Sequence, residues 1–348
     1  MKLTNMRGLF AVLFVGLLFC SVAGFGQGMG MSDNPIYKPY YDSLKQMNYP
    51  YKLPILGKQA YKRGYDIQYA YGISGIYFTQ RQDIDIQSIQ IGFNGSQMVD
   101  LSNFIKFGPT VANTNAYTVR PDIWLLPFLN VYGIIGGGTT ETNVSLIEPI
   151  GFETVQNFKA DSYGLGVTLA GAVGPIFLAW DNNYNFVDVE AIVEPMPAFN
   201  SSLRVGHTIM SPSKPQKSLS VWGGVFYQSL QNDTKGSLNL TEIFPDFGNG
   251  FVFDSLRDWS ATLPPAQRLV VNQIIDALEE MSNGVDVENA TVDYLLEKKV
   301  AAPFNLIFGA QYQFNKHWIL RTELGVFGKR SQFLLNLNYR IPGLKRVR

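Results

Sequence analysis

The chain has 348 residues and no net formal charge at neutral pH, and only 16% of its residues are charged. This balance lacks the basic excess that marks a nucleic-acid-binding protein, so that class of function is excluded. Hydrophobic residues make up 46% of the chain, yet beyond the N-terminus no uninterrupted apolar run resembles a membrane helix.

The first 23 residues have the pattern of a secretory signal peptide. Lys2 and Arg7 precede the apolar run GLFAVLFVGLLFC, and the small residues Ser21 and Ala23 follow it. A basic start, a short apolar stretch and a small-x-small site are the parts of a cleaved signal, so we predict cleavage after Ala23. An uncleaved anchor is the alternative, although the apolar run is short for a spanning helix.

The only cysteine, Cys20, lies inside this predicted signal peptide. The bulky Phe19 precedes it where lipoprotein sites usually have a small residue, so we do not expect Cys20 to be lipidated. The mature chain would then contain no cysteine and form no disulfide. An exported chain of this size that is stable without disulfides suits a large β-structure in a Gram-negative envelope.

Residues 24–65 come before the clear strand pattern and are predicted to form an N-terminal extension. This extension would serve either as a plug or as the first strand of the sheet. Residues 53–68 are the candidate for that strand.

From residue 66 to residue 341, apolar and polar residues alternate in segments of about ten residues. A period of two is typical of β-strands with one apolar and one polar face. Eleven strands are predicted, at residues 70–80, 84–93, 116–126, 129–139, 199–209, 218–229, 304–314, 317–327 and 331–341 and on either side of the Gly174-Pro175 turn. Short turns follow residues 80, 126, 174, 210 and 314, and long polar stretches occupy 94–115, 140–160, 187–198 and 230–300.

Two glycine-rich apolar segments, 123–138 and 162–180, come closest to a transmembrane helical hairpin. Pro127 interrupts the first segment, and Gly174-Pro175 interrupts the second. Glycine disfavours a helix, and proline removes one of its hydrogen bonds. Both segments are therefore interpreted as strand–turn–strand, with the helical hairpin as the alternative.

The C-terminal hairpin, residues 317–341, separates its two faces clearly. Leu320 and Leu324 fall on the apolar face, whereas Arg321 and Glu323 fall on the other face. A helix would distribute these charges around its whole surface. One such hairpin fits either a half-buried sheet of a soluble protein or a sheet whose apolar face meets lipid.

One insert, within residues 250–299, departs from the strand pattern. Apolar residues recur at helical spacing over 264–281, after Pro264-Pro265 and before the stop signal Gly284. The residues predicted to face inward are Leu269, Val270, Ile274, Leu278 and Met281. A second short helix is predicted over 287–299, with Val292, Leu295 and Leu296 inward. These helices would constrict a barrel lumen, cap its mouth, or simply pack on neighbouring loops.

The strands at 304–314, 317–327 and 331–341, with the ending Tyr339-Arg340-Ile341, resemble those of Gram-negative outer-membrane β-barrels as a class. Short turns at one end and long loops at the other are typical of such barrels, and only helices and closed barrels can span lipid. Aromatic residues near the strand ends fit the interface girdles of these proteins: Tyr117, Trp180, Tyr184, Phe304, Tyr312, Phe314, Trp318 and Tyr339. The resemblance covers roughly residues 66–341. It implies an all-β fold, an antiparallel transmembrane β-barrel of about twelve strands with a helical loop insert.

The chain departs from this class in one respect, at its C-terminus. Such barrels often end on an aromatic residue that the assembly machinery reads. Here the last strand ends at Ile341, and a basic tail, residues 342–348, follows. The strand count also needs a twelfth member to be even, which is the reason for considering 53–68.

Residues suited to catalysis or metal binding are scarce. The chain holds only two histidines, His207 and His317, and no HExxH motif, cysteine ligand set or phosphate-binding glycine loop. A serine hydrolase would need one of these histidines beside a serine and an acid. We predict no catalytic residue, no cofactor and no metal, and an outer-membrane enzyme is the third-ranked function.

If the apolar faces point outward, seven charged strand residues point into the lumen, because charges that face lipid are costly. The predicted lumen-lining residues are Arg120, Asp122, Asp181, Arg204, Arg321, Glu323 and Arg340. They would line a watery pore or form ion pairs that fill a narrow barrel. Because both signs are present, strong ion selectivity is not expected.

The predicted function is therefore that of an outer-membrane, porin-like channel or transporter for small solutes. The alternative is a non-conducting structural or adhesive barrel that acts through its loops. Outer-membrane lipid and small solutes are the expected partners, and nucleic acid is not one. Analogy between folds carries most of this prediction.

Overall fold

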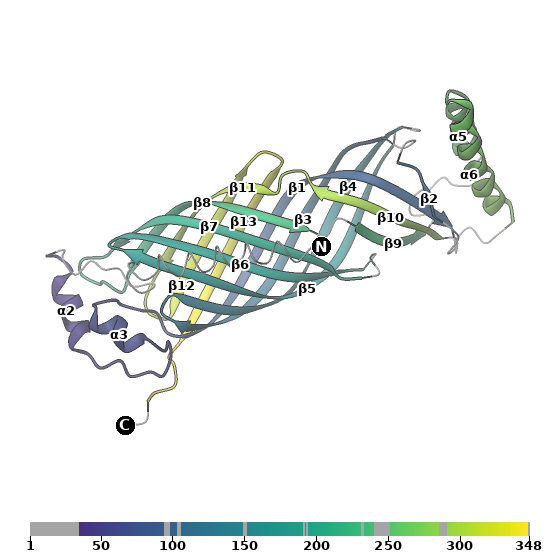
Figure 1. Cartoon of the computed structure of the whole chain (residues 1–348). Helices are drawn as coiled ribbons and strands as arrows, with labels where there is room; N and C mark the ends of the chain where they lie inside the picture. The colour runs from purple at the N-terminus through teal and green to yellow at the C-terminus, as the bar shows by residue number, and fades with distance from the viewer. Residues whose placement is uncertain are drawn as a thin grey trace, which may run out of the picture.

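The structure, a computed structural model, describes residues 35–93, 98–102, 106–148, 152–190, 192, 194–230, 233–239, 251–284 and 291–346. The predicted signal peptide, residues 1–23, lies outside the described residues. The described chain is a long β-barrel with small helices near each end (Figure 1).

Ten antiparallel strands close the ring of the barrel. In ring order they are β1 (Tyr71–Phe93), β3 (Lys106–Leu126), β4 (Leu129–Glu148), β5 (Phe152–Val173), β6 (Ile176–Val189), β7 (Met196–Met210), β8 (Ser218–Leu230), β11 (Phe304–Gln313), β12 (Trp318–Phe327) and β13 (Arg330–Ile341). The last strand returns to the first, with pairs running from Tyr71↔Ile341 to Gln82↔Arg330. This pairing closes the sheet on itself and covers the edges of both strands.

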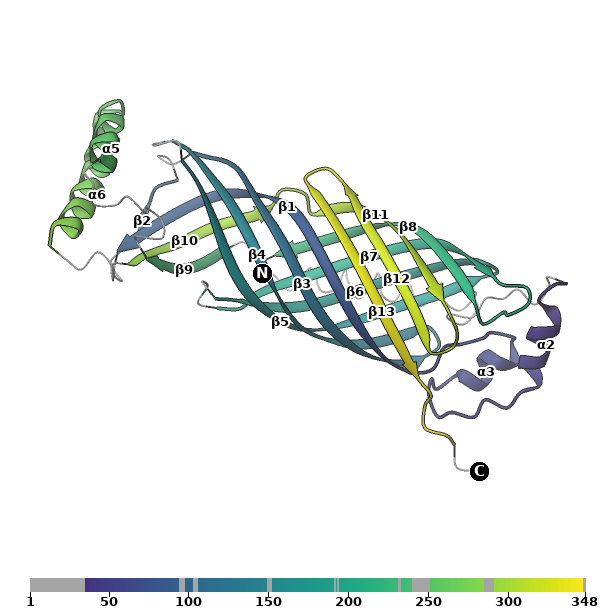
Figure 2. The ribbon, with the colours of Figure 1, turned by 180° about the vertical axis from the view of Figure 1, so that it is seen from behind.

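Two further strands lie outside the ring. These are β9 (Asp233–Asn239) and β10 (Thr291–Val300), which pair with each other, and β10 also pairs with the second half of β1 (Figure 2). A two-residue strand, β2 (Val99–Asp100), pairs with β1 as well. The barrel predicted at about twelve strands therefore has ten strands in its ring, whereas β2, β9 and β10 lie outside it.

The turn predicted between residues 80 and 84 is wrong, because β1 is one continuous strand. Arg81 pairs with Ser331 on one side and with Asn113 on the other. The Asp83 amide donates to the carbonyl oxygen of Lys329 at 2.9 Å, and the Asp83 carbonyl accepts from the Ala301 amide at 3.1 Å. The polar run looks like a turn in sequence, but non-local hydrogen bonds keep it extended.

The twelfth strand predicted at 53–68 is also wrong. This segment holds helix α3 (Gly57–Lys62), which follows helix α2 (Lys38–Gln46). A Cβ atom at Gly57 would lie only 2.3 Å from the ring of Tyr49, so the start of α3 packs directly against this aromatic side chain. The segment therefore packs as a helical extension, and no strand of the ring includes it.

The strands β1, β3, β4 and β5 are much longer than predicted, at 20 to 23 residues. About ten residues suffice to cross a bilayer. Pairing of β4 with β5 continues from Leu129↔Leu169 to Leu146↔Phe152, through most of the predicted loop 140–160. The polar outer halves of β3, β4 and β5 fall in the predicted loops 94–115 and 140–160 because neither face is apolar, yet their backbones stay paired well beyond the apolar wall.

The wall of the barrel is apolar outside and polar inside. Along β7, Leu203 and Val205 are exposed, whereas Arg204 between them is buried. Along β12, Leu324 is exposed and its neighbour Glu323 is buried. A soluble half-buried sheet would show the reverse arrangement, so the exterior suits lipid and the interior suits water or polar groups.

Exposed aromatic side chains form two bands on the outer surface. One band lies next to the short turns and includes Tyr312, Phe314 and Trp318. The other lies about nine residues along the strands and contains neighbouring rings such as Tyr77–Tyr117, Tyr163–Phe186 and Tyr227–Phe304. Between the bands the outward positions are mostly Leu, Ile and Val. Two aromatic bands around an apolar belt are the exterior of a transmembrane barrel.

The helical-hairpin alternative is wrong, because 123–138 and 162–180 form the β3–β4 and β5–β6 hairpins. Among the residues that the structure describes, no helix is both long and apolar enough to cross a membrane.

We expect Leu320→Arg to destabilise the barrel in a bilayer, because the Leu320 side chain is exposed on the apolar belt. The cost of an arginine facing lipid is about 2–4 kcal/mol at the midplane and about 0–1 kcal/mol near the interfaces. Leu320 lies two residues from Trp318 of the aromatic band, so we expect a cost between these values, about 1–2 kcal/mol. Urea titration of unfolding in phospholipid vesicles measures it. Leu344→Arg is the control, because Leu344 is exposed but lies beyond the last strand. If both variants are equally stable, β12 does not face lipid.

The insert contains two helices packed on each other, α5 (Phe251–Ala261) and α6 (Pro265–Gly284). The helix expected at 264–281 is present as α6. The second helix, expected at 287–299, is wrong over 291–299, where β10 lies, and 287–290 lie outside the described residues. The face expected to be buried is shifted by one residue: Leu269 is exposed, and Val271 and Ile275 pack against Phe253. Figure 1 places this helix pair beyond the ends of β9 and β10, at the opposite end from α2 and α3.

Candidate functional site

A cavity of about 230 Å³ lies inside the barrel, near the end that carries the short turns. Strands from around the ring form its walls, and Tyr40, Tyr41, Asp66 and Gln68 of the N-terminal segment contribute to its lining. None of the described side chains of α5 and α6 lines it. The polar lumen and this N-terminal segment are therefore the candidate functional site, and the predicted lumen constriction by α6 does not occur at this cavity.

The structure brings the seven predicted lumen residues together inside the barrel. Six of them line the cavity: Arg120, Asp122, Asp181, Arg204, Arg321 and Arg340. The seventh, Glu323, is buried against Arg204. Their charges are not free in an open channel, because most of them make specific side-chain contacts across the lumen.

The first of these contacts is a buried ion pair between Arg204 and Glu323. The Arg204 Nε–Glu323 Oε2 distance is 2.6 Å, and the Nη2–Oε1 distance is 3.0 Å. The indole N–H of Trp222 also donates to Oε2 at 2.9 Å. Because β8 and β11 separate β7 from β12 in the ring, this pair joins non-adjacent strands through the interior. It is a bidentate, charge-assisted ion pair that stabilises the lumen.

The second contact joins Arg340 to Asp122, with 2.5 Å between Nη1 and Oδ1. Asn130 Nδ2 donates to the same carboxylate oxygen at 2.8 Å. The remaining Arg340 donors reach the carbonyl oxygens of Tyr69 and Ala70 at 2.8–3.1 Å, so this arginine ties the N-terminal segment to the last strand. Gly72 makes room for the pair, because a Cβ atom there would lie 2.2 Å from Arg340 Nη1.

The other three predicted residues are held in a different way. Asp181 accepts hydrogen bonds from Thr168 Oγ1 at 2.5 Å and from Tyr132 Oη at 2.9 Å. The Arg120 guanidinium lies over the Tyr132 ring, 4.1 Å from its centroid. Arg321 lies over the Trp222 ring at 4.9 Å, and its Nη2 is 3.4 Å from Glu323 Oε2. Both arginines are therefore positioned mainly by aromatic faces.

Several polar atoms of the cavity wall have no protein partner among the described residues. They are Arg120 Nε, Arg321 Nε, Asn336 Oδ1 and Asn338 Oδ1, and all four are buried. Buried polar groups without a partner are unfavourable unless water or a solute satisfies them. Further unpartnered atoms lie elsewhere on the strands, as at Asn305 and Gln332, so these four mark this cavity as one part of a lumen that can hold water or a small polar molecule. Asn336 and Asn338 lie on the polar face that the sequence predicts, but they were not singled out because they carry no charge.

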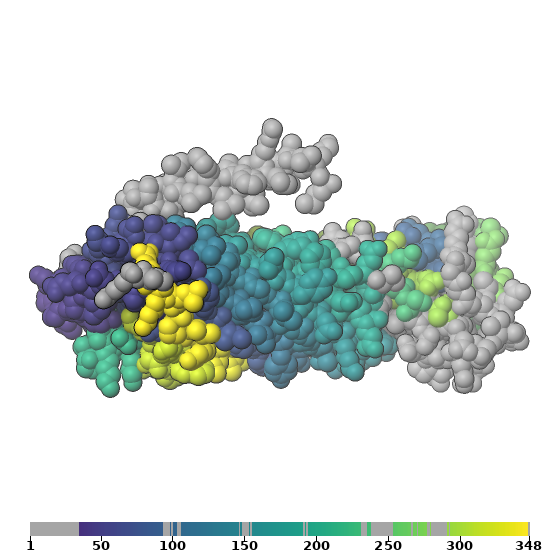
Figure 3. Space-filling view, turned by 90° about the horizontal axis from the view of Figure 1, so that it is seen from below, coloured from purple at the N-terminus to yellow at the C-terminus, as the bar shows by residue number. Residues whose placement is uncertain are grey.

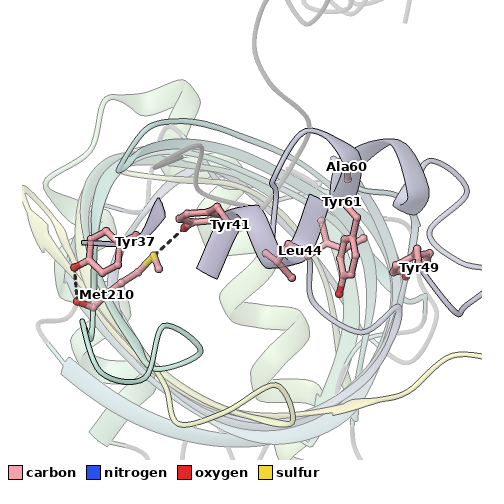
Figure 4. Close-up of a cluster of buried hydrophobic side chains, with 8 residues drawn as sticks. Tyr37, Tyr41, Leu44, Tyr49, Ala60, Tyr61 and Met210 are labelled. Carbon is pink, nitrogen blue, oxygen red and sulfur yellow. Dashed lines mark hydrogen bonds between the residues drawn. The ribbon is translucent and has the colours of Figure 1, made fainter. Parts of the chain in front are cut away.

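An N-terminal cap, residues 35–70, covers the short-turn end of the ring (Figure 4). Its buried cluster joins Tyr37, Tyr41, Leu44, Tyr49, Ala60, Tyr61 and Ile67 of the cap to Met210 of β7. The Tyr37 hydroxyl donates to the Met210 carbonyl oxygen at 2.9 Å, and the Tyr41 hydroxyl lies 3.1 Å from the Met210 sulfur. Figure 4 shows α2 lying across part of the opening of the ring, so the cap narrows this end.

The C-terminal tail holds the cap in place. The Lys52 amide donates to the Leu344 carbonyl oxygen at 2.9 Å, and the Arg346 amide donates to the Pro50 carbonyl oxygen at 2.9 Å. Between these bonds, Tyr51 and Lys345 face each other as an antiparallel bridge. Figure 3 shows the C-terminal residues, in yellow, lying against the cap, in purple. The tail that departs from the usual barrel ending is thus part of the cap's attachment.

The cap has a second attachment, an ion pair between Asp66 and Lys316 in the β11–β12 turn. The Lys316 Nζ–Asp66 Oδ1 distance is 2.8 Å, and the Tyr40 hydroxyl donates to the other carboxylate oxygen at 2.5 Å. Both partners are largely buried. This pair links the floor of the cavity to the barrel wall.

The attachment of the cap should weaken in alkali. Burial raises the pKa of Tyr40, with Asp66 adding to the effect, and burial raises the pKa of Tyr41 and Tyr49 as well. A raised pKa means that the attached cap holds these phenolic protons more tightly than the free chain. Its stability is therefore complete below about pH 10 and falls as the pH rises further.

We accordingly expect α2 and α3 to become sensitive to an alkaline-active protease above about pH 10, while the barrel stays folded. Cleavage is followed on gels, where the heat-modifiable band reports the barrel. A cap that stays protected at every pH at which the barrel is folded would contradict this attachment.

The two histidines lie away from any catalytic arrangement. His207 is exposed on the outer face of β7. His317 has its Nδ1 2.8 Å from the Arg340 carbonyl oxygen and stacks on Tyr339. Among the described residues there is no group of three or more His, Cys, Asp or Glu side chains suited to a metal ion. The absence of an enzymatic function stays a prediction.

No protein-family model matches the sequence, and no curated protein matches it either. Among solved structures, the chain is similar to the beta domain of the Bordetella autotransporter Brka, at 7% identity and a TM-score of 0.39, with 78% of this chain and 100% of that chain covered. It is also similar to the outer membrane protein OprG from Pseudomonas aeruginosa, at 10% identity and a TM-score of 0.37, with 80% and 100% covered. It is similar as well to the Ralstonia pickettii toluene transporter TbuX, at 11% identity and a TM-score of 0.30, with 92% of this chain and 95% of that chain covered.

These likenesses are too weak to carry an argument, so the class rests on the chain's own geometry. A closed antiparallel ring, an apolar exterior between two aromatic bands and a polar interior define an outer-membrane type of β-barrel.

Proposed function

We propose that the protein is an outer-membrane channel for small polar solutes, and that the N-terminal cap closes its short-turn end. The observation that carries this proposal is the polar cavity directly behind the cap, with buried donors and acceptors that no protein group satisfies. Such a lumen is favourable only when water or a polar solute occupies it.

The location follows from the same geometry and from the predicted signal peptide. The apolar belt needs lipid around it, and a signal peptide at 1–23 would export the chain to the envelope. In bacterial barrels the short turns face the periplasm. The cap and the C-terminal tail would then lie on the periplasmic side, and α5 and α6 on the outside.

A non-conducting structural barrel is the competing function, favoured by the two buried ion pairs that brace the lumen. Well-packed apolar residues would fill such a barrel at equal or lower cost than ion pairs do. A barrel that served only as support would have no use for a hydrated cavity closed by a separate segment. We therefore favour passage of solutes over support.

The test is conductance of the purified full-length protein in planar bilayers. Asp66→Asn removes the ion pair with Lys316 and weakens the acceptor of Tyr40, so we expect this variant to open more often than the wild type. Asp42→Asn is the matched control, because Asp42 lies in the same cap but only pairs with Lys45 on the surface. If wild type and Asp66→Asn both stay silent although folded, the channel proposal fails and the structural barrel takes its place.

A further inference from the structure

The positive and negative charges of the lumen side chains do not sum to zero. Around the cavity the described residues supply five cations, Arg120, Arg204, Arg321, Arg340 and Lys316, and four anions, Asp66, Asp122, Asp181 and Glu323. One positive charge is therefore left around this cavity inside the barrel. A buried charge without a counter-charge is strongly unfavourable, so this excess favours a bound anion.

The pairing pattern shows where the excess lies. Arg204, Arg340 and Lys316 each have a carboxylate within 3 Å, at Glu323, Asp122 and Asp66. Asp181 is the remaining acid, and it already accepts two hydrogen bonds, from Thr168 and Tyr132. Arg321 Nη2 is 3.4 Å from Glu323 Oε2, the oxygen that Arg204 Nε already contacts, so Arg204 and Arg321 share this acid. Among the described residues Arg120 has no carboxylate within ion-pair distance, so Arg120 and Arg321 are the two cations without a carboxylate of their own.

These two arginines are also held so that they can receive a ligand. Each is positioned by an aromatic ring, Tyr132 or Trp222, and the Nε–H of each has no protein acceptor among the described residues. Both side chains line the same cavity, so their like charges repel each other. A small anion between them would relieve this repulsion and accept hydrogen bonds from their planar guanidinium groups.

A further cation lies toward the other end of the lumen. Arg330 is 2% exposed, at the start of β13, and its side-chain contacts are neutral. It donates to Gln82 Oε1 at 2.7 and 3.0 Å and to Gln228 Oε1 at 2.7 Å, and it lies over the Phe226 ring. Its Nη1 has no partner in the described part of the chain. The lumen therefore offers positive sites in succession.

We propose that the lumen selects small monovalent anions such as acetate, which pass from Arg330 to a site between Arg120 and Arg321. This inference deepens the proposed function and rests on it for the passage, although binding of the anion does not require passage. It revises the expectation, drawn from the presence of both signs, that the lumen would not be selective. Arg330 and the Arg120–Arg321 site each carry one positive charge that no acid balances, and a monovalent anion neutralises one such charge.

The first test is the reversal potential in a potassium acetate gradient across a planar bilayer. We expect a reversal potential whose sign shows that acetate is more permeant than potassium. Arg120→Gln with Arg321→Gln should shift the potential toward zero, and Arg330→Gln should shift it in the same direction if the double variant does not fold. Arg81→Gln is the matched control, because Arg81 lies beside Gln82 but is exposed outside. A potassium-preferring wild type overturns the anion site while leaving the channel in place.

The second test measures binding without current. Iodide quenches tryptophan emission on contact, and Trp222 is buried beside Arg321. We expect iodide to quench the Trp222 emission, identified as the part that Trp222→Phe removes, and this quenching should saturate. Caesium should have no such effect, and in Arg321→Gln the iodide quenching should no longer saturate. A protein that quenches in this way but never conducts has the anion site without the channel function. Equal quenching of the Trp222 emission by iodide and by caesium would overturn the anion site.

Discussion

Oxidation of the double variant Tyr51→Cys, Lys345→Cys is expected to abolish solute flux, and reduction is expected to restore it to the wild-type level. The two residues form a non-hydrogen-bonded antiparallel pair between the cap and the C-terminal tail, the arrangement in which side chains approach most closely. A disulfide there fixes the cap over the ring. Liposome swelling with a small solute, with and without reductant, measures the effect.

The two single-cysteine variants are the controls for this experiment. The only natural cysteine lies in the predicted signal peptide, so each single variant has no partner to bond with. Both should respond to reductant no more than the wild type does. Flux that survives complete cross-linking would mean that solutes bypass the cap, and the cap would then have no role in closure.

Glu323→Gln is expected to be the most destabilising conservative change in the lumen. It removes the carboxylate that pairs with Arg204 and leaves this arginine buried without a carboxylate at ion-pair distance, while Arg321 loses its contact with the same carboxylate. Breaking one side of a buried ion pair costs about 3–5 kcal/mol. Unfolding in urea, followed by tryptophan fluorescence in vesicles, measures the loss.

Two variants control for this result. Glu153→Gln makes the same chemical change on an exposed position of β5, where we expect less than about 0.5 kcal/mol. Arg204→Leu with Glu323→Leu removes both charges, and it should be more stable than Glu323→Gln because Arg204 is no longer a buried cation without its counter-charge. If Glu323→Gln matches Glu153→Gln in stability, the pair does not brace the barrel.

The sequence predicts the local features of the barrel well. Alternation places Arg321 and Glu323 opposite Leu320 and Leu324, and the structure buries Glu323 and exposes both leucines. A period of two is a property of each strand alone, so the inward residues can be assigned without knowing the strand's neighbours. The same reasoning finds Arg204 and Asp122 in their strands.

The sequence does not reveal contacts between distant segments. The polar run at 81–83 reads as a turn, although Ser331 and Asn113 pair with its backbone. The attachment of Pro50–Lys52 to the C-terminal tail likewise depends on residues almost three hundred positions away, and neither segment has a strong pattern of its own. Only the apolar and aromatic character of the cap, with its many tyrosines, could have indicated a packed segment there.

The sequence also could not predict which of the charged lumen residues form ion pairs with each other. Alternation assigns Arg204 and Glu323 to the interior, but the order of β7, β8, β11 and β12 decides that they meet. Segment 287–299 shows a related limit, since its spacing fits a short helix until β1 and β9 pair with it. Non-local pairing overrides local periodicity in such short segments.

The most direct test of the account is whether current passes through the polar cavity. Asn336→Cys places a thiol on the cavity wall, where the native side chain has an unpartnered oxygen. A charged methanethiosulfonate reagent should reduce the single-channel current of this variant. The same reagent should leave Leu335→Cys unchanged, because Leu335 faces outward. A modified Asn336→Cys channel that conducts like the unmodified one would contradict passage through the lumen.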